Sequence, residues 1–71
     1  MAVLTDREKD VLLRTAKGES PQTIGSALSI RPRTVELHLA SVRDKLRVSS
    51  DEAAITAAQD NNLIPKQLPM S

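Results

Sequence analysis

The residues best suited to chemistry in this chain are basic ones, and they gather between positions 31 and 47 of its 71 residues. Five basic residues there outnumber two acidic ones, so the segment carries +3 while the whole chain carries +1. The basic residues are Arg31, Arg33, Arg43, Lys45 and Arg47. Guanidinium and ammonium groups bind phosphate oxygens, and arginine does so in a bidentate geometry. Such a local excess points to a phosphate-bearing partner.

Few residues in the chain are suited to metal binding or catalysis. The chain has no cysteine and a single histidine, His38, which argues against a metal site built from protein ligands alone. Its two glycines are isolated, so there is no phosphate-cradling loop, and no nucleophile has a marked base partner. We therefore expect no enzymatic activity, no metal and no cofactor. His38 is expected to be packed and hydrogen-bonded at the edge of an apolar stripe.

The basic residues lie in a segment, 31–48, with the periodicity of an amphipathic helix. Its apolar residues are spaced for one buried stripe: Val35, Leu39, Val42 and Leu46. A second stripe lies about a third of a turn away: Arg33, Glu36, Ala40, Arg43 and Arg47. Pro32 suits the first helical position, so the helix should span about 32–46. One side can then pack in a core while the other faces a polyanion.

Start and stop signals predict three further helices. Thr5 and Glu8 have capping-box spacing, and the helix they begin should reach about Lys17 before Gly18 ends it. Ser20 followed by proline begins a short helix at 21–28, and Ser49 or Ser50 can begin a fourth at about 50–60. A short helix, a tight turn and a longer helix form a helix-turn-helix. We predict an all-α, four-helix domain over residues 1–64, with a flexible tail at 65–71.

Several packing contacts follow from the pattern. Glu8 either only caps its helix or also pairs with a cation such as Lys45, and both readings remain open. Gly25, inside the second helix, indicates close approach by a neighbouring helix. The residues expected to face the core from the other helices are Val11, Leu12, Thr15, Ala16, Ile24, Ala27, Leu28, Ala54, Ile55 and Ala58. Leu63 and Ile64 should fold back onto the core.

Together these motifs resemble the LuxR-type DNA-binding domain, the output module of many bacterial transcription and response regulators. The matching segments are LTDREKDVL at 4–12, Gly18-Glu19-Ser20, TIGSALSI at 23–30 and PRTVELHLASVRDKLRV at 32–48. The resemblance covers residues 4 to about 58. It implies that the second and third helices form the helix-turn-helix, and that the fourth serves dimerisation on DNA.

The resemblance also implies which residues meet DNA. Base contacts would come from the positions just after Thr34 and Val35, namely Glu36, Leu37 and Ala40. Arg33, Thr34 and Lys45 match positions that contact the DNA backbone or brace the fold. The residue chemistry adds Arg31, Arg43 and Arg47 as phosphate contacts, and Arg33 or Arg43 as readers of guanine.

Individual side chains leave alternatives open. Glu36 can accept a hydrogen bond from cytosine N4, or it can simply pair with Arg33 or Arg43. Leu37 or Ala40 can pack on a thymine methyl group. Ala53 and Ala57, beside the buried face of the fourth helix, are candidates for a dimer interface.

The chain departs from the family pattern at four positions. Arg31 stands where a serine cap is usual, and Arg47 stands where glycine is usual, so Arg47 either adopts positive φ itself or the helix ends differently. Asp51 replaces a common arginine, and Gly25 a common alanine.

We expect a cytoplasmic protein without a membrane span that binds double-stranded DNA as a homodimer on paired half-sites, with RNA polymerase as a further candidate partner. Two alternatives remain: a sigma-factor-like domain, and a helical protein-interaction module that has lost DNA binding.

Overall fold

The computed structural model describes residues 3–65 and contains four helices in that range. They are α1 (Asp6–Ala16), α2 (Pro21–Leu28), α3 (Pro32–Leu46) and α4 (Asp51–Asp60). The described residues contain no strand. The predicted all-α fold with its helix-turn-helix is confirmed, and α2 and α3 have the predicted bounds. Of the tail predicted at 65–71, only Pro65 lies within the described residues.

Hydroxyl side chains begin three of the four helices. The Thr5 hydroxyl accepts the Glu8 amide at 3.1 Å while the Glu8 carboxylate accepts the Thr5 amide at 2.8 Å, so the predicted capping box is present. Ser20 and Ser50 accept the amides of the third residues of α2 and α4. Arg31, in the same position before α3, makes no capping hydrogen bond. The start of α3 is therefore fixed by Pro32 and by packing, not by a side-chain cap.

Residues in the left-handed conformation end the first three helices. Gly18 has φ of 90° just after α1, which ends at Ala16, one residue before the predicted end. Ser29 (φ 59°) closes α2 and Arg47 (φ 57°) closes α3. Of the two possibilities left open for Arg47, the chain adopts positive φ at a non-glycine residue. This conformation costs an L-residue about 1–2 kcal/mol.

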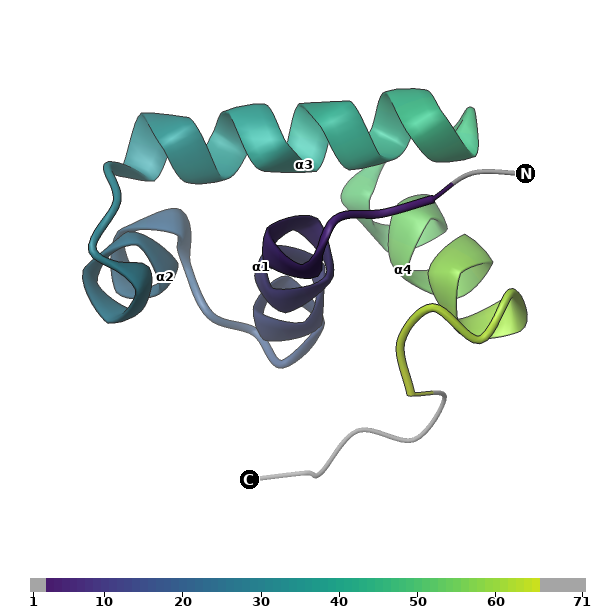
Figure 1. The fold of residues 1–71 in the computed structure, drawn as a ribbon, viewed down its shortest axis with the longest axis horizontal. Coiled ribbons are helices and arrows are strands. Elements are labelled where there is room, and N and C mark those ends of the chain that lie inside the picture. The colour runs from purple at the N-terminus through teal and green to yellow at the C-terminus, as the bar shows by residue number, and fades with distance from the viewer. Residues whose placement is uncertain (1–2, 66–71) are drawn as a thin grey trace.

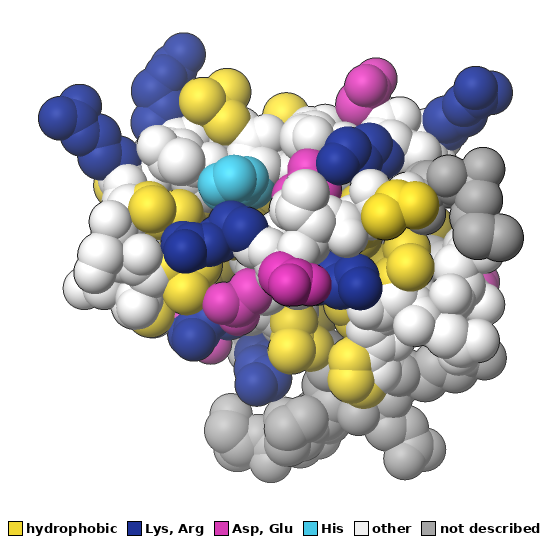
Figure 2. Space-filling model, in the orientation of Figure 1, with side chains coloured by type: hydrophobic (Ala, Val, Ile, Leu, Met, Phe, Trp, Pro, Cys, Tyr) yellow, Lys and Arg dark blue, Asp and Glu magenta, His cyan; other side chains and the backbone are white. Residues whose placement is uncertain are grey.

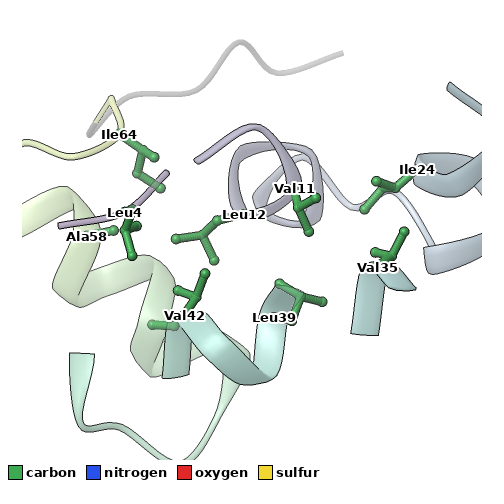
Figure 3. Packing of buried hydrophobic residues seen from close by; sticks show 10 residues of the cluster. Leu4, Val11, Leu12, Ile24, Val35, Leu39, Val42, Ala58 and Ile64 are labelled. Carbon is green, nitrogen blue, oxygen red and sulfur yellow. The ribbon is translucent and has the colours of Figure 1, made fainter. Parts of the chain in front are cut away.

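The core lies beneath α3, which crosses the other three helices (Figure 1). α1 lies between α2 and α4, and α2 and α4 do not touch. Figure 3 shows the apolar side chains that meet there. They are Leu4, Val11, Leu12, Ile24, Val35, Leu39, Val42, Ala54, Ala58 and Ile64. Leu28, Leu46, Ile55 and Leu63 pack around them and are half-buried.

One packing prediction for α2 needs correction, and a second is made more specific by the structure. Ala27 was expected in the core but is exposed, because the buried side of α2 runs through Ile24, Gly25 and Leu28, about a third of a turn away. Gly25 was expected to face a neighbouring helix. A Cβ there would lie 2.5 Å from the Ile30 carbonyl oxygen in the turn and 3.3 Å from the backbone nitrogen of Pro32, the first residue of α3, so the close approach is confirmed. The turn backbone therefore occupies the space that a side chain would need.

Candidate nucleic-acid interface

The outward face of α3 is the surface that the sequence assigned to DNA. Arg33, Glu36, Ala40 and Asp44 are all exposed there, while Val35, Leu39 and Val42 point into the core. Leu37 has 59% of its surface exposed, which is unusual for a large apolar side chain in the described part of the molecule. The helical repeat places Leu37 and Asp44 nearly opposite the buried stripe. The centre of this face is therefore apolar and acidic, not basic.

Unpaired arginines mark both ends of the same face. Arg31 and Arg33 lie at the amino-terminal end of α3 and Arg47 at its carboxyl-terminal end, all exposed and without an ion pair to any described residue. Along the edge formed by α3, basic side chains project at both ends, with apolar and acidic ones between them (Figure 2). A rise of 1.5 Å per residue separates positions 33 and 47 by about 21 Å. The positive charge is thus divided between two separate points.

Glu36 contributes a carboxylate to this face. Its alternative assignment, an ion pair with Arg33 or Arg43, is not found among the described residues. Thr34, also proposed to meet DNA, lies half-buried in the first turn of α3.

Arg43 lies at the edge of the face and is directed away from its centre. Its guanidinium donates to the Asp51 carboxylate in the first turn of α4 at 2.5 Å, and its side chain is half-buried. The sequence predicts that Arg43 contacts phosphate or guanine and does not predict its ion pair with Asp51. Asp51 is eight residues away, and only the angle between α3 and α4 brings it within reach.

Lys45 lies on the opposite edge of α3 and is held by α1. Its ammonium donates to Glu8 at 2.7 Å, and the Ser41 hydroxyl donates to the other oxygen of that carboxylate, also at 2.7 Å. Only 5% of the Glu8 side chain is exposed. Glu8 therefore both caps α1 and pairs with Lys45. The role of Ser41 was not predicted, although Ser41 lies one helical turn before Lys45 and must share its side of α3.

The Glu8 carboxylate is stabilised in its charged form. Burial by itself would raise the pKa of Glu8, but hydrogen bonds from Lys45, the Thr5 amide and Ser41, together with the ammonium charge, outweigh it. The pKa falls from 4.5 to about 2. Lys45 is consequently a brace between α1 and α3 in this structure, one of the two roles that the family resemblance allowed.

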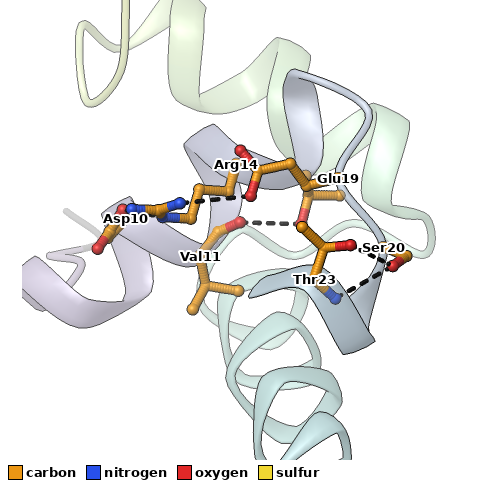
Figure 4. A network of polar contacts seen from close by, with 7 residues as sticks. Asp10, Val11, Arg14, Glu19, Ser20 and Thr23 are labelled. Atoms are coloured by element: carbon orange, nitrogen blue, oxygen red, sulfur yellow. Dashed lines mark hydrogen bonds and ion pairs between the residues drawn. The ribbon is translucent and has the colours of Figure 1, made fainter. Parts of the chain in front are cut away.

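A second polar network fixes the turn before α2. Arg14 donates to Asp10 at 3.0 Å and to Glu19 at 3.3 Å, and these hydrogen bonds raise the pKa of Arg14 (Figure 4). In the same region the Thr15 hydroxyl donates to the Val11 carbonyl. This network ties α1 to the loop that starts α2 and thereby helps to set the position of the helix-turn-helix.

The remaining predicted residues have a less defined setting. His38 is half-buried at the edge of the apolar stripe, but the expected hydrogen bond is not made with any residue that the structure describes. Ala53 and Ala57 lie half-buried on α4, one turn apart. Within residues 3–65, no helix is long and apolar enough to cross a membrane, and no three potential ligands cluster for a metal ion.

Comparison with known proteins places this arrangement in a family. Residues 2–58 match the family model described as bacterial regulatory proteins, luxR family. The response regulator protein VraR of Staphylococcus aureus is 42% identical over 62 residues, which are 87% of this chain and 30% of VraR. VraR of Staphylococcus saprophyticus matches equally well.

Solved structures agree with the sequence match. The response regulator ChrA of a heme-sensing two-component system superposes with a TM-score of 0.82 at 36% identity, over 90% of this chain and 32% of ChrA. VqmA bound to DPO superposes with a TM-score of 0.74 at 34% identity, over 92% of this chain and 36% of VqmA. The chain thus spans about a third of the length of these relatives. It belongs to the luxR family of bacterial regulatory proteins.

Proposed function

We propose that this chain is a sequence-specific DNA-binding domain of a bacterial transcription regulator, with α3 lying in the major groove. The observation that carries the proposal is the division of charge along α3. Arginines without an ion pair to any described residue lie at its two ends, and an apolar and acidic face lies between them. Membership in a family of bacterial regulatory proteins supports the same conclusion.

The arginines suit the two phosphate backbones that border a groove. A B-DNA major groove is about 12 Å wide and admits one helix, so ends about 21 Å apart extend past both edges. Arg31 and Arg47 would each bind phosphate, and Thr34 would add a hydroxyl donor. Because Arg31 provides no side-chain cap, the Thr34 amide is also open to a phosphate oxygen at the positive end of the helix dipole. These contacts would set the position of α3 without reading the sequence.

The face between the arginines would read bases. The Glu36 carboxylate pairs with no cation among residues 3–65 and can accept a hydrogen bond from cytosine N4. Leu37 and Ala40 are exposed and can pack against thymine methyl groups, while Arg33 can reach guanine from the amino-terminal end. So few contacts give little discrimination by one copy. We therefore infer that two copies bind paired half-sites, with Ala53 and Ala57 at their interface.

The first test measures binding to a random-sequence duplex at increasing salt. Log affinity should fall linearly with log salt, by about 0.9 for each phosphate neutralised. Arg31→Gln should reduce the slope by about 0.9 with little loss of stability, because its side chain caps nothing. Lys17→Gln removes the same charge from an exposed position after α1 and should leave the slope unchanged. Absence of binding at low salt would favour the alternative of a protein-interaction module.

A selection from random duplexes tests the reading face. Glu36→Ala should change the selected sequence while leaving the salt slope nearly unchanged, because a base reader adds preference more than general affinity. An identical selected sequence would remove Glu36 from the readers. Footprinting on the selected site tests the dimer, since protection of a single half-site at saturating protein would contradict it.

A further inference from the structure

The two cations at the edges of α3 are held in different ways. Lys45 pairs with a carboxylate that is 5% exposed and that three protein groups stabilise as donors. Arg43 pairs with Asp51, and the side chains of this pair are 33% and 41% exposed. One guanidinium nitrogen contacts the carboxylate, which leaves other N–H groups of Arg43 without a described protein partner. The two cations are similarly exposed, Lys45 at 35% and Arg43 at 33%, so the difference lies in their carboxylates: Glu8 is buried and Asp51 is open to solvent.

Burial of the partner carboxylate decides whether a phosphate can compete for each cation. A phosphate approaching Lys45 would have to leave the Glu8 carboxylate buried without its cation, which is strongly unfavourable. A phosphate approaching Arg43 displaces a carboxylate that water can solvate at once. Exposed ion pairs favour the paired state only about 1.4- to 5-fold. Of the two cations, Arg43 is therefore the one that a polyanion can bind in place of its carboxylate partner.

We propose that Asp51 is an internal competitor for phosphate at Arg43 and lowers the affinity of α3 for the DNA backbone. The inference rests on the proposed function, because it concerns the same surface of α3. In the unbound chain the Asp51 carboxylate is paired with the Arg43 guanidinium. Without that pairing, the guanidinium would be available to phosphate at the carboxyl-terminal half of α3. When DNA binds, phosphate and carboxylate compete for the same cation, and the carboxylate also repels the arriving phosphate.

The chain provides a matched control for the Asp51 charge. Glu52 is the next residue in the same first turn of α4, is exposed, and makes no ion pair with a described residue. Asp51→Asn and Glu52→Gln each remove one negative charge near the positive end of the α4 dipole. Ser50 continues to cap the helix in both variants. A difference between them in DNA binding therefore reports the contact with Arg43 and not the general charge.

The experiment measures affinity for a random-sequence duplex as a function of salt, for the whole chain and these variants. Asp51→Asn should bind about two- to fivefold more tightly at low salt than Glu52→Gln, corresponding to release of an exposed ion pair. Its log–log salt slope should steepen by about 0.9, because one more phosphate is neutralised. In an Arg43→Gln background, Asp51→Asn and Glu52→Gln should become indistinguishable. Circular dichroism and thermal unfolding check that each variant folds.

The outcomes separate this inference from the proposed function. If the unmodified chain fails to bind duplex DNA at low salt, the proposed function is wrong. If it binds with the expected salt dependence but Asp51→Asn matches Glu52→Gln, the competitor role is overturned and DNA binding stands. Weaker binding by Asp51→Asn would also overturn it, since that result means that the carboxylate orients Arg43 toward phosphate.

Discussion

Arg47 combines a conformational cost with a proposed contact, so its replacement should change stability and DNA binding in opposite directions. It closes α3 with φ of 57° and ψ of 47°, in the left-handed region. An L-residue there costs about 1–2 kcal/mol, whereas glycine adopts the conformation freely. Glycine loses about 0.5–1 kcal/mol more in chain entropy on folding, which offsets part of the gain. We expect Arg47→Gly to raise the free energy of unfolding by about 0.5–1 kcal/mol.

That gain is measurable in a domain of this size. A change of 1 kcal/mol shifts the midpoint of thermal unfolding by about 4–8 °C in domains of 60–100 residues, so Arg47→Gly should unfold a few degrees higher. Its salt slope for duplex binding should be smaller by about 0.9, because one phosphate contact is lost. Thermal unfolding by circular dichroism and a salt series of binding isotherms measure the two effects on the same preparations.

Two further substitutions at the same position separate the causes. Arg47→Gln removes the charge but keeps the side chain at positive φ, so it should weaken binding without raising stability. Arg47→Lys keeps both the charge and the strain, so it should resemble the unmodified chain in each assay. If the thermal unfolding midpoint of Arg47→Gly is no higher than that of Arg47→Gln, the conformational argument fails. If both bind DNA with the original slope, Arg47 contacts no phosphate.

Two other predictions concern the scaffold that positions α3. The folded pKa of Glu8, about 2, lies below its unfolded value of 4.5, so its contribution is complete above pH 4.5 and disappears as the pH falls toward 2. As the pH falls across this range, the free energy of unfolding should decrease by about 3 kcal/mol more in the unmodified chain than in Glu8→Gln, and equal decreases would contradict the pairing. Gly25→Ala should lower the free energy of unfolding by about 1–3 kcal/mol, because its Cβ would clash with the Ile30 carbonyl oxygen. Ser26→Ala, on the exposed side of α2, is the control. An unchanged thermal unfolding midpoint for Gly25→Ala would show that the turn can move to relieve the clash.

Local chemistry explains why most of the fold could be predicted from the sequence. The Thr5–Glu8 capping box, the Ser20–Pro21 start and the Gly18 stop are each decided within four residues. Such signals need no knowledge of the neighbouring helices, because the groups they satisfy belong to the helix ends themselves. The start of α2 followed from such a signal, and the start of α3 followed from Pro32 at its first position.

The errors arose where the packing direction between elements decides the outcome. Ala27 has the spacing of a core residue, but the turn and α3 cover the other side of α2. The salt bridge between Arg43 and Asp51 depends on how α4 leaves α3. The periodicity of α3 located its buried side correctly and placed the centre of its outer side too near Arg43, because an amphipathic pattern does not show which flank a neighbouring helix will cover.

These contacts change what the basic segment can offer a polyanion. The sequence assigns +3 to residues 31–47, but the structure commits Lys45 to Glu8 and Arg43 to Asp51. The exposed charges that remain are Arg31, Arg33 and Arg47 against Glu36 and Asp44, a net of +1. Because sequence-independent binding depends almost entirely on neutralised phosphates, a surface with so small an excess should hold random DNA weakly. Under the proposed function, discrimination would then depend on the face centred on Leu37, and general affinity would depend on whether Arg43 is released.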